Sequence, residues 1–225
     1  MIRHVISHYE PHDPVVRHRQ MLAQSSWADQ PWQEIRITDD ALPRLFSERM
    51  KRLPFIRDLF DLASADCPPE AILLFSNADI GFCSNAAFRV VLALQANDAG
   101  YAFRRDLPPR QTLPTDEEIS EGKEYAGTDV FFFRVGWWTQ WRERFPDMLI
   151  GREAWDACLR VLIEDTNRNK PLAISDLVWH VRHGGNEYWE TPATRYTLPG
   201  QLHNLRLART FLRTCNRNPA NFGIR

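Results

Sequence analysis

The sequence lacks any stretch of 18 consecutive apolar residues, so it predicts no transmembrane helix. Its first residues lead straight into a strand-like segment without the apolar core of a signal peptide, and we therefore expect a cytoplasmic protein. The cysteines form no CxxC pair, which argues against structural zinc and favours reduced, mostly buried thiols. The four cysteines are Cys67, Cys83, Cys158 and Cys215.

An excess of charge of one sign is also missing. The 28 Lys and Arg residues nearly balance the 29 Asp and Glu residues, giving a formal net charge of -1. No global basic field therefore argues for nucleic-acid binding, although a local patch could still serve an enzyme acting on a nucleic acid or a glycan. GxGxxG, GxxxxGK[ST], GxSxG and HExxH are all absent. Dinucleotide oxidoreductases, P-loop NTPases, α/β-hydrolases and zincins thus lose their usual support.

What the chain does contain is an alternation of strand and helix patterns. Its 225 residues, 44% of them hydrophobic, suit a single domain that spans 1–225. Strands are expected at 4–9, 32–38, 72–75, 101–103, 129–135 and 172–174, and helices at 14–25, 49–63, 85–96, 136–143, 151–165 and 202–214. This order predicts an α/β fold with a mostly parallel central sheet and helices on both faces.

Two further features of the composition bear on structure and ligand binding. Residues 107–124 are rich in Pro, Thr and acidic residues and predict a flexible loop, a kind of segment that often serves as a lid. Trp residues number 8 and gather in the second half of the chain. We expect Trp137, Trp138, Trp141 and Trp155 to lie mainly in the core, with one or two free to stack on a sugar or a base.

The most informative segment is 71–80, an apolar run of strand length that ends in Ser76-Asn77-Ala78-Asp79. A continuous apolar run is typical of a strand buried on both faces, and open α/β sheets bind ligands beyond the carboxyl ends of such strands. A carboxylate at that place suits a hard divalent cation that also holds phosphate oxygens. A turn Asn followed by a capping Asp is the structural alternative.

Three more groups of polar residues stand at expected element ends. Gly127 and Asp129 precede an apolar strand, where Gly127 permits close backbone approach and Asp129 is either a strand-start cap or an acceptor-binding acid. Glu153 and Asp156 are spaced to share one helix face and fit equally well as first-turn acids favoured by the helix dipole. His180, and with it His183 before Gly184-Gly185, follows the last expected strand.

This set, in this order, resembles the GT-A class of nucleotide-sugar glycosyltransferases. In that class a strand ends in a DxD-type motif, and Asn77-Ala78-Asp79 stands in its place with Asn77 where the first acid would be. The resemblance implies that Asp79 holds a divalent metal, Mn or Mg, on the nucleotide diphosphate, with His183 or His180 completing the metal shell. It also implies a GT-A-like, Rossmann-like domain with a nucleotide-sugar-binding half at 1–100 and an acceptor-binding half at 101–225.

The implied reaction moves a sugar from a nucleotide-sugar donor to an acceptor hydroxyl, the acceptor being a glycan, a small molecule, a protein or a nucleic acid. Glu153, Asp156 or Asp129 would act on the acceptor side, since a positioned carboxylate can take the hydroxyl proton. The donor side would include Asn77 and Asp79 together with three further residues. These are Tyr9 after the first strand, and Arg52 and Arg57 on the helix expected before the metal strand.

Two alternatives remain open at this stage. A nucleotidyltransferase also uses strand-end acids, but it usually carries a Gly-rich basic loop after its first strand, where this chain has Ser7-His8-Tyr9-Glu10-Pro11. A non-catalytic nucleotide- or sugar-binding module on the same scaffold would explain the departure at Asn77. Loss of turnover on Asp79→Asn with folding intact would favour an enzyme over the module.

Overall fold

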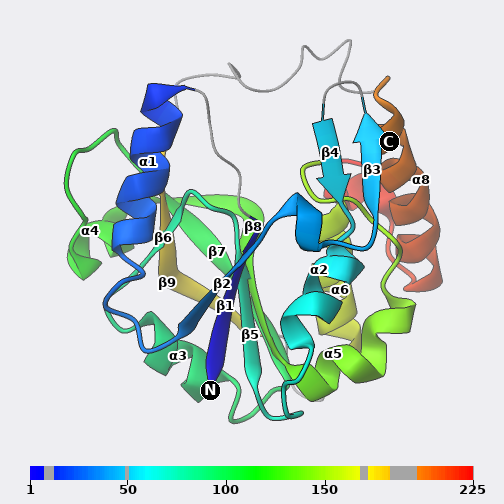
Figure 1. Ribbon diagram of the computed structural model, residues 1–225, viewed down its shortest axis with the longest axis horizontal. Coiled ribbons are helices and arrows are strands. Elements are labelled where there is room, and N and C mark those ends of the chain that lie inside the picture. Colours follow the sequence, from blue (N-terminus) through cyan, green and yellow to red (C-terminus); the bar gives the residue numbers. More distant parts are fainter. Residues whose placement is uncertain (8–12, 49–50, 168–171, 183–196, 225) are drawn as a thin grey trace.

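The computed structural model describes residues 1–7, 13–48, 51–167, 172–182 and 197–224 (Figure 1). Within these residues the main sheet has seven strands in the order β2-β1-β5-β8-β7-β9-β6, and β3 and β4 form a separate hairpin. The strands are β1 (Ile2–Ser7), β2 (Gln33–Ile37), β3 (Leu45–Glu48), β4 (Lys51–Pro54), β5 (Ile72–Ser76), β6 (Ile80–Phe82), β7 (Ala99–Leu107), β8 (Lys123–Arg134) and β9 (Leu172–Val181).

The strand directions confirm a mostly parallel sheet. β2, β1 and β5 pair in parallel, β8 runs antiparallel to both β5 and β7, and β9 is parallel to β7. β6 runs antiparallel to β9 at the edge. Strands β2, β1, β5, β7 and β9 therefore share one direction, and β8 and β6 run against it.

Helices cover both faces of this sheet, as the sequence predicts (Figure 1). α2 (Ile56–Ser64), α5 (Val135–Trp141), α6 (Trp155–Thr166) and α8 (Pro199–Thr214) pack on one face, and α1 (Pro14–Ser25), α3 (Ala86–Ala93) and α4 (Asp116–Glu121) pack on the other. Short 3-10 helices are η1 (Asp39–Ala41), η2 (Arg142–Arg144) and η3 (Pro219–Phe222). Among the described residues, none of these helices combines the length and the apolarity that crossing a bilayer requires.

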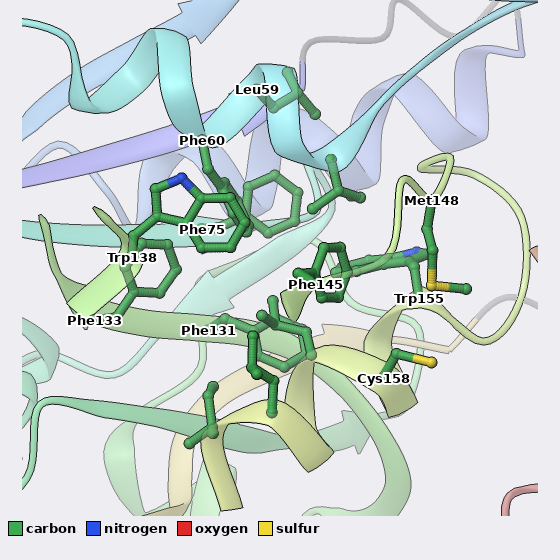
Figure 2. Packing of buried hydrophobic residues seen from close by; sticks show 14 of the residues in the cluster. Leu59, Phe60, Phe75, Phe131, Phe133, Trp138, Phe145, Met148, Trp155 and Cys158 are labelled. Carbon is green, nitrogen blue, oxygen red and sulfur yellow. The ribbon is translucent and has the colours of Figure 1, made fainter. Parts of the chain in front are cut away.

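Alternation along the buried strands divides the core into two clusters. In β8, Phe131 and Phe133 point to the α2/α6 face, whereas Val130 and Phe132 point to the α1/α3 face. Figure 2 shows the first cluster, in which rings from β5 and β8 meet Phe60 of α2 and neighbouring aromatic side chains. Edge-to-face contacts recur there, with ring centroids 5.0–5.3 Å apart around Phe60.

The tryptophans of the second half belong to this core. Trp137, Trp138 and Trp155 are buried, and Trp141 is partly buried against the same cluster. The expectation of a mainly structural role is confirmed. The rings of Trp137, Trp138 and Trp155 are therefore closed to stacking by a ligand.

Several expected elements change their bounds in the structure. The helix expected at 14–25 is confirmed, and the Asp13 carboxylate caps it by accepting bonds from the backbone N–H groups of Val15 and Val16. The helix expected at 49–63 is wrong in its first part, because Lys51–Pro54 forms strand β4 and α2 begins at Ile56. Pro54 disfavours helical backbone at the residue before it, so the helix starts only beyond the proline.

The stretch 107–124, expected to be a loop, contains a helix. α4 carries a capping box, in which the Thr115 hydroxyl accepts from the Glu118 N–H and the Glu118 carboxylate accepts from the Thr115 N–H. Its buried residue Ile119 packs into the second core cluster. One buried apolar contact therefore fixes this segment against the sheet.

Candidate active site

The Asn77–Asp79 segment connects β5 to β6 at the carboxyl edge of the parallel strands. From β1 the chain passes through α1 on one face to β2, and it returns through α2 on the other face to β5. The point between β1 and β5, where the direction of winding reverses, is where open α/β sheets bind their ligands. The polar end of β5 therefore lies at the expected ligand edge.

A buried contact fixes the end of β5. The Ser76 hydroxyl lies 2.7 Å from His4 Nε2, and the imidazole is packed among the rings of Trp27, Trp32 and Phe82. Burial lowers the pKa of His4 to about 3, so this histidine is neutral. It acts as a structural support immediately behind Asn77.

Asn77 joins β5 to Asp129 of β8. The Asn77 amide donates to Asp129 Oδ1 over 3.1 Å, and Arg104 Nη1 donates to Asp129 Oδ2 over 3.0 Å. Asp129 stands inside β8 (Lys123–Arg134), so the alternative of a strand-start cap is wrong. The Asn77 amide, just beyond β5, thus orients a carboxylate that comes from a different strand.

A second set of contacts links Arg104 to Asp79. Arg104 Nε donates to Asp106 Oδ1 over 2.9 Å, and Asp106 Oδ1 lies 3.2 Å from His180 Nδ1. On the other side of the ring, His180 Nε2 lies 3.4 Å from Asp79 Oδ2. Asn77, Asp129, Arg104, Asp106, His180 and Asp79 thus form one connected group, the charged cluster.

His180 reaches this cluster from within a strand. β9 extends to Val181, so the expectation that the last strand ends near 174 is wrong. Successive residues of a strand face opposite sides, and the neighbouring Trp179 packs into the second core cluster. His180 is therefore turned toward the opposite face, where Asp79 and Asp106 meet it.

The charges of the cluster shift its pKa values. Burial acts to raise the pKa of Asp79, but the hydrogen bond and charge of His180 outweigh it and hold that pKa below its ordinary value. Burial acts to lower the pKa of His180, yet its bonds to Asp106 and Asp79 raise it overall. Both effects favour an ionised Asp79 beside a protonated His180.

Asp129 and Asp156 behave in the opposite way. Burial raises the pKa of Asp129, and the charge of Asp79 adds to the increase against the attraction of Arg104. Burial also raises the pKa of Asp156 to about 6, with a contribution from the charge of Asp129. Asp156 belongs to the first turn of α6, whose Trp155 packs against Phe131 of β8 with ring centroids 5.5 Å apart. A carboxyl group with a pKa near neutrality therefore lies beside the charged cluster.

Glu153 occupies a different setting from Asp156. Helix α6 begins at Trp155, because Gly151 (φ 74°) and Ala154 (φ 77°) both have left-handed backbone. The expectation that Glu153 and Asp156 share a helix face is therefore wrong, since Glu153 precedes the helix. Its carboxylate Oε2 accepts from the Gln201 side chain over 2.9 Å.

The other residues predicted to bind the nucleotide-sugar donor are not among the members of the charged cluster. Arg57 on α2 contacts Glu143 over 3.3 Å and the carbonyl of Phe145, which are contacts within the helical layer. Arg52 is exposed on β4, where its Cα pairs with Ser47. Tyr9 and His183 lie outside the described residues.

Sequence reasoning missed Arg104, Asp106 and Tyr125. Arg104 and Asp106 lie beyond the short strand expected at 101–103, and β7 continues to Leu107. The available signal for a longer strand is the apolar residues at Tyr101, Phe103 and Leu107, which are spaced by multiples of two. Tyr125 lies over the guanidinium of Arg104, with 3.9 Å from Cζ to the ring centroid.

Gly127 allows that ring to take its place. A Cβ atom at Gly127 would lie 2.3 Å from Tyr125 Cε1, a distance that real side chains do not reach. The ring therefore fills the space that a side chain at 127 would need. The group closest to Gly127 is thus an aromatic ring of the same strand, β8.

Two crystal structures of one protein are among the solved structures that match this chain. A crystal structure of S. aureus TarS 1-349 in complex with UDP-GlcNAc matches with a TM-score of 0.54 and 12% identity, covering 98% of this chain and 74% of that chain. The likeness establishes the fold. A second crystal structure of S. aureus TarS 1-349 matches with a TM-score of 0.49 and 11% identity, over 98% and 73% of the two chains. The α/β fold expected from the GT-A resemblance is thus confirmed at the level of architecture.

Comparison of the sequence itself gives nothing further. No protein-family model matches the chain. No curated protein matches it either.

Part of the charged cluster has the chemistry of a metal site. Among the residues that the structure describes, no group of three or more His, Cys, Asp and Glu side chains is arranged to hold a metal ion. Asp79 and His180 nonetheless offer an oxygen and a nitrogen 3.4 Å apart, and Asp106 holds the other ring nitrogen of His180. A carboxylate behind a histidine is the usual support for a metal-binding imidazole. The pair fits part of a metal shell, and the predicted third residue, His183, is outside the described residues.

Proposed function

We propose that the protein is a glycosyltransferase that moves a sugar from a nucleotide-diphosphate sugar to an acceptor hydroxyl. The observation that carries this proposal is the charged cluster at the winding switch point of the sheet, where ligands bind in open α/β folds. The fold adds support, because it is shared with a protein solved in complex with the nucleotide sugar UDP-GlcNAc.

The donor side of the proposed site is the corner formed by Asp79 and His180. Once His180 Nε2 has released its proton, these side chains would hold a divalent cation, Mn or Mg, with His183 as a further ligand. When bound, such a cation neutralises the negative charge that develops on the departing diphosphate. Asp106 fixes the His180 ring so that Nε2 faces Asp79. Tyr9, Arg52 and Arg57 remain candidates for contacts to the nucleotide.

Arg104 and Asn77 organise the centre of the site. Arg104 bridges Asp129 and Asp106, and those two carboxylates raise its pKa against the opposing effect of burial. A fixed cation between two acids keeps both carboxylates in place, whereas isolated buried charges would be expensive. Asn77 adds a neutral donor to Asp129, so the motif contributes orientation at its first position and charge at its last.

The acceptor side is formed by Asp156, Glu153 and Asp129. We assign Asp156 as the general base, because its pKa of about 6 leaves a carboxylate at neutral pH that still has appreciable proton affinity. It takes the proton of the acceptor hydroxyl while the hydroxyl oxygen bonds to the anomeric carbon and the bond from that carbon to the diphosphate oxygen breaks. Glu153 accepts a hydrogen bond from the bound acceptor and orients it.

A panel of nucleotides tests this function. We expect UDP with Mn or Mg to raise the melting temperature, since a ligand that binds only the native state stabilises it. ADP, CDP and GDP with each metal, and each metal alone, complete the panel, followed by hydrolysis assays of the matching sugar nucleotides. If no nucleotide at millimolar concentration changes the melting temperature, the assignment of a nucleotide-sugar donor is wrong. A shift without turnover of any sugar nucleotide would instead favour a binding module.

A further inference from the structure

The loop that leads into α6 is attached to the start of α8 by buried polar side chains. Asn204 accepts from the Leu149 N–H and donates to the carbonyls of Leu149 and Glu153, at 2.8, 2.8 and 3.1 Å. Gln201 accepts from the Glu153 N–H over 3.0 Å and donates to the Glu153 carboxylate over 2.9 Å. Both ends of the loop are therefore held by one helical turn.

A buried ion pair holds the middle of the same loop. Arg152 Nε donates to Glu48 Oε2 over 2.8 Å, and Glu48 Oε1 accepts from the Gly200 N–H over 2.6 Å. Glu48 is the last residue of β3, and its side chain is 1% exposed. The hairpin, the loop and α8 thus meet at a single carboxylate.

This attachment holds the loop in an unfavourable backbone conformation. Ala154 has φ 77°, a value that costs free energy in any residue with a Cβ and persists only where the surroundings enforce it. Gln201 and Asn204 are 2% and 0% exposed, and each uses its amide on the loop. Fully bonded buried networks of this kind specify one conformation.

We propose that Gln201 is a positioning residue that fixes the Glu153 carboxylate for the acceptor, with Glu48 and Arg152 fixing the loop beneath it. The proposal rests on the proposed function for its catalytic consequence, but the geometry of the loop stands apart from it. Gln201 holds Glu153 at two points, the backbone N–H and Oε2, and so sets the direction of the side chain.

Among the described residues, the elements around this loop contribute both charged and neutral polar side chains. Glu48 comes from β3, Arg152 from the loop itself and Asp156 from α6, while α8 contributes the neutral Gln201 and Asn204. His203 of α8 turns to the carbonyl of Asp147 instead, at 2.8 Å. A carboxylate introduced at 201 would therefore face the Glu153 carboxylate across the 2.9 Å that the Gln201 amide spans now.

The test compares Gln201→Leu and Gln201→Glu with Gln30→Leu as the matched control. Gln30 is also a buried amide, on the other face of the sheet, where it donates to the carbonyls of Cys83 and Ser84. The probe is hydrolysis of UDP-GlcNAc, or of whichever sugar nucleotide in the panel is turned over. We expect Gln201→Leu to lower kcat about 10- to 100-fold, as loss of a supporting bond does elsewhere, with the donor KM and the UDP-induced melting shift unchanged.

Gln201→Glu supplies a readout that a purely structural role would not move. Two adjoining carboxylates cannot both ionise freely, so this substitution should raise the pKa of Glu153. A ¹³C-carboxyl NMR titration, with Glu153 assigned by loss of its signal in Glu153→Gln, measures the same rise of the Glu153 pKa without any turnover. Glu48→Gln, which keeps the bond from Gly200, should lower kcat less than Gln201→Leu does.

The arms separate the two proposals. If no nucleotide raises the melting temperature of the wild-type protein and no sugar nucleotide is turned over, the proposed function is wrong. The NMR titration then still decides whether Gln201 controls the pKa of Glu153. An unchanged Glu153 pKa in both Gln201 variants would overturn the positioning role. So would a loss of kcat in Gln30→Leu as large as that in Gln201→Leu.

Discussion

Asp106 and His180 are direct register partners on β7 and β9, and Asp106 Oδ1 lies 3.2 Å from His180 Nδ1. The strand pairing itself therefore aims the other ring nitrogen at Asp79. An irregularity in the same pairing, where Asp176 takes a left-handed φ of 58°, sets this register. Bulges of this kind re-aim side chains next to binding sites.

Asp79→Asn should abolish the melting shift that UDP and Mn produce together. The amide keeps the shape of the side chain but removes the negative charge that the proposed cation requires. Thermal denaturation with and without the ligands measures the effect. Asp29→Asn, an exposed acid near the opposite face, is the control and should keep the full shift. An intact shift in Asp79→Asn would remove Asp79 from the proposed donor site.

Asp156→Asn should stabilise the protein at neutral pH while it lowers turnover. The folded-state pKa of Asp156 is about 6, above its ordinary value of 3.8, so the folded state retains a proton that the unfolded chain has released. Asp156 therefore reduces stability progressively as pH rises from about 4 to 6, by up to about 3 kcal/mol at one pKa unit per 1.36 kcal/mol. Urea denaturation at pH 4 and pH 7 should show a gain for the variant only at pH 7. Equal effects at the two pH values would contradict the raised pKa.

Arg104→Ala should destabilise the fold strongly at neutral pH. The substitution leaves Asp129 and Asp106 without the guanidinium that bridges them, and removal of one partner from a buried ion pair costs ~3–5 kcal/mol. The loss should shrink toward acid pH, beginning where Asp129, whose pKa is raised by burial, becomes protonated. Chemical denaturation across that range measures both effects. Arg36→Ala, which breaks an exposed pair with Glu34, should change stability by less than about 1 kcal/mol.

Gly127→Ala should displace the Tyr125 ring from Arg104. The new methyl group would occupy the position of the ring edge, so the cation–π contact is lost, a contribution of about 0.5–2 kcal/mol. A double-mutant cycle with Tyr125→Ala checks the cause, because Gly127→Ala should cost little once the ring is absent. Additive losses from the two substitutions would show that Gly127 acts through some other contact.

Local patterns explain the parts of the fold that could be predicted. Asp13 before Pro14 defines the start of α1, because a capping carboxylate and a fixed φ act within one turn. The continuous apolar run at 72–75 predicts a buried strand, and β5 (Ile72–Ser76) is buried throughout. These patterns depend on neighbours in sequence, so they can be recognised without the tertiary structure.

Other elements depend on distant partners. β6 has three residues and exists because it pairs with β9, about 100 residues later. The hairpin of β3 and β4 is likewise stabilised where Glu48 meets Arg152. Arg104 contacts Asp129 of β8, and Asp106 contacts His180 of β9, because β7 lies between those two strands. No local periodicity in the sequence predicts such pairings.

The sequence by itself determined the alternation of strands and helices, the buried character of the central strands and the polar end at Asn77 and Asp79. Periodicity and capping decide these features because they act over a few residues. Only the tertiary structure decided that Asn77 orients Asp129, that His180 belongs to a strand and that Glu153 is held by Gln201. Those contacts join residues 48 or more positions apart, and packing of the sheet and helices brings them together.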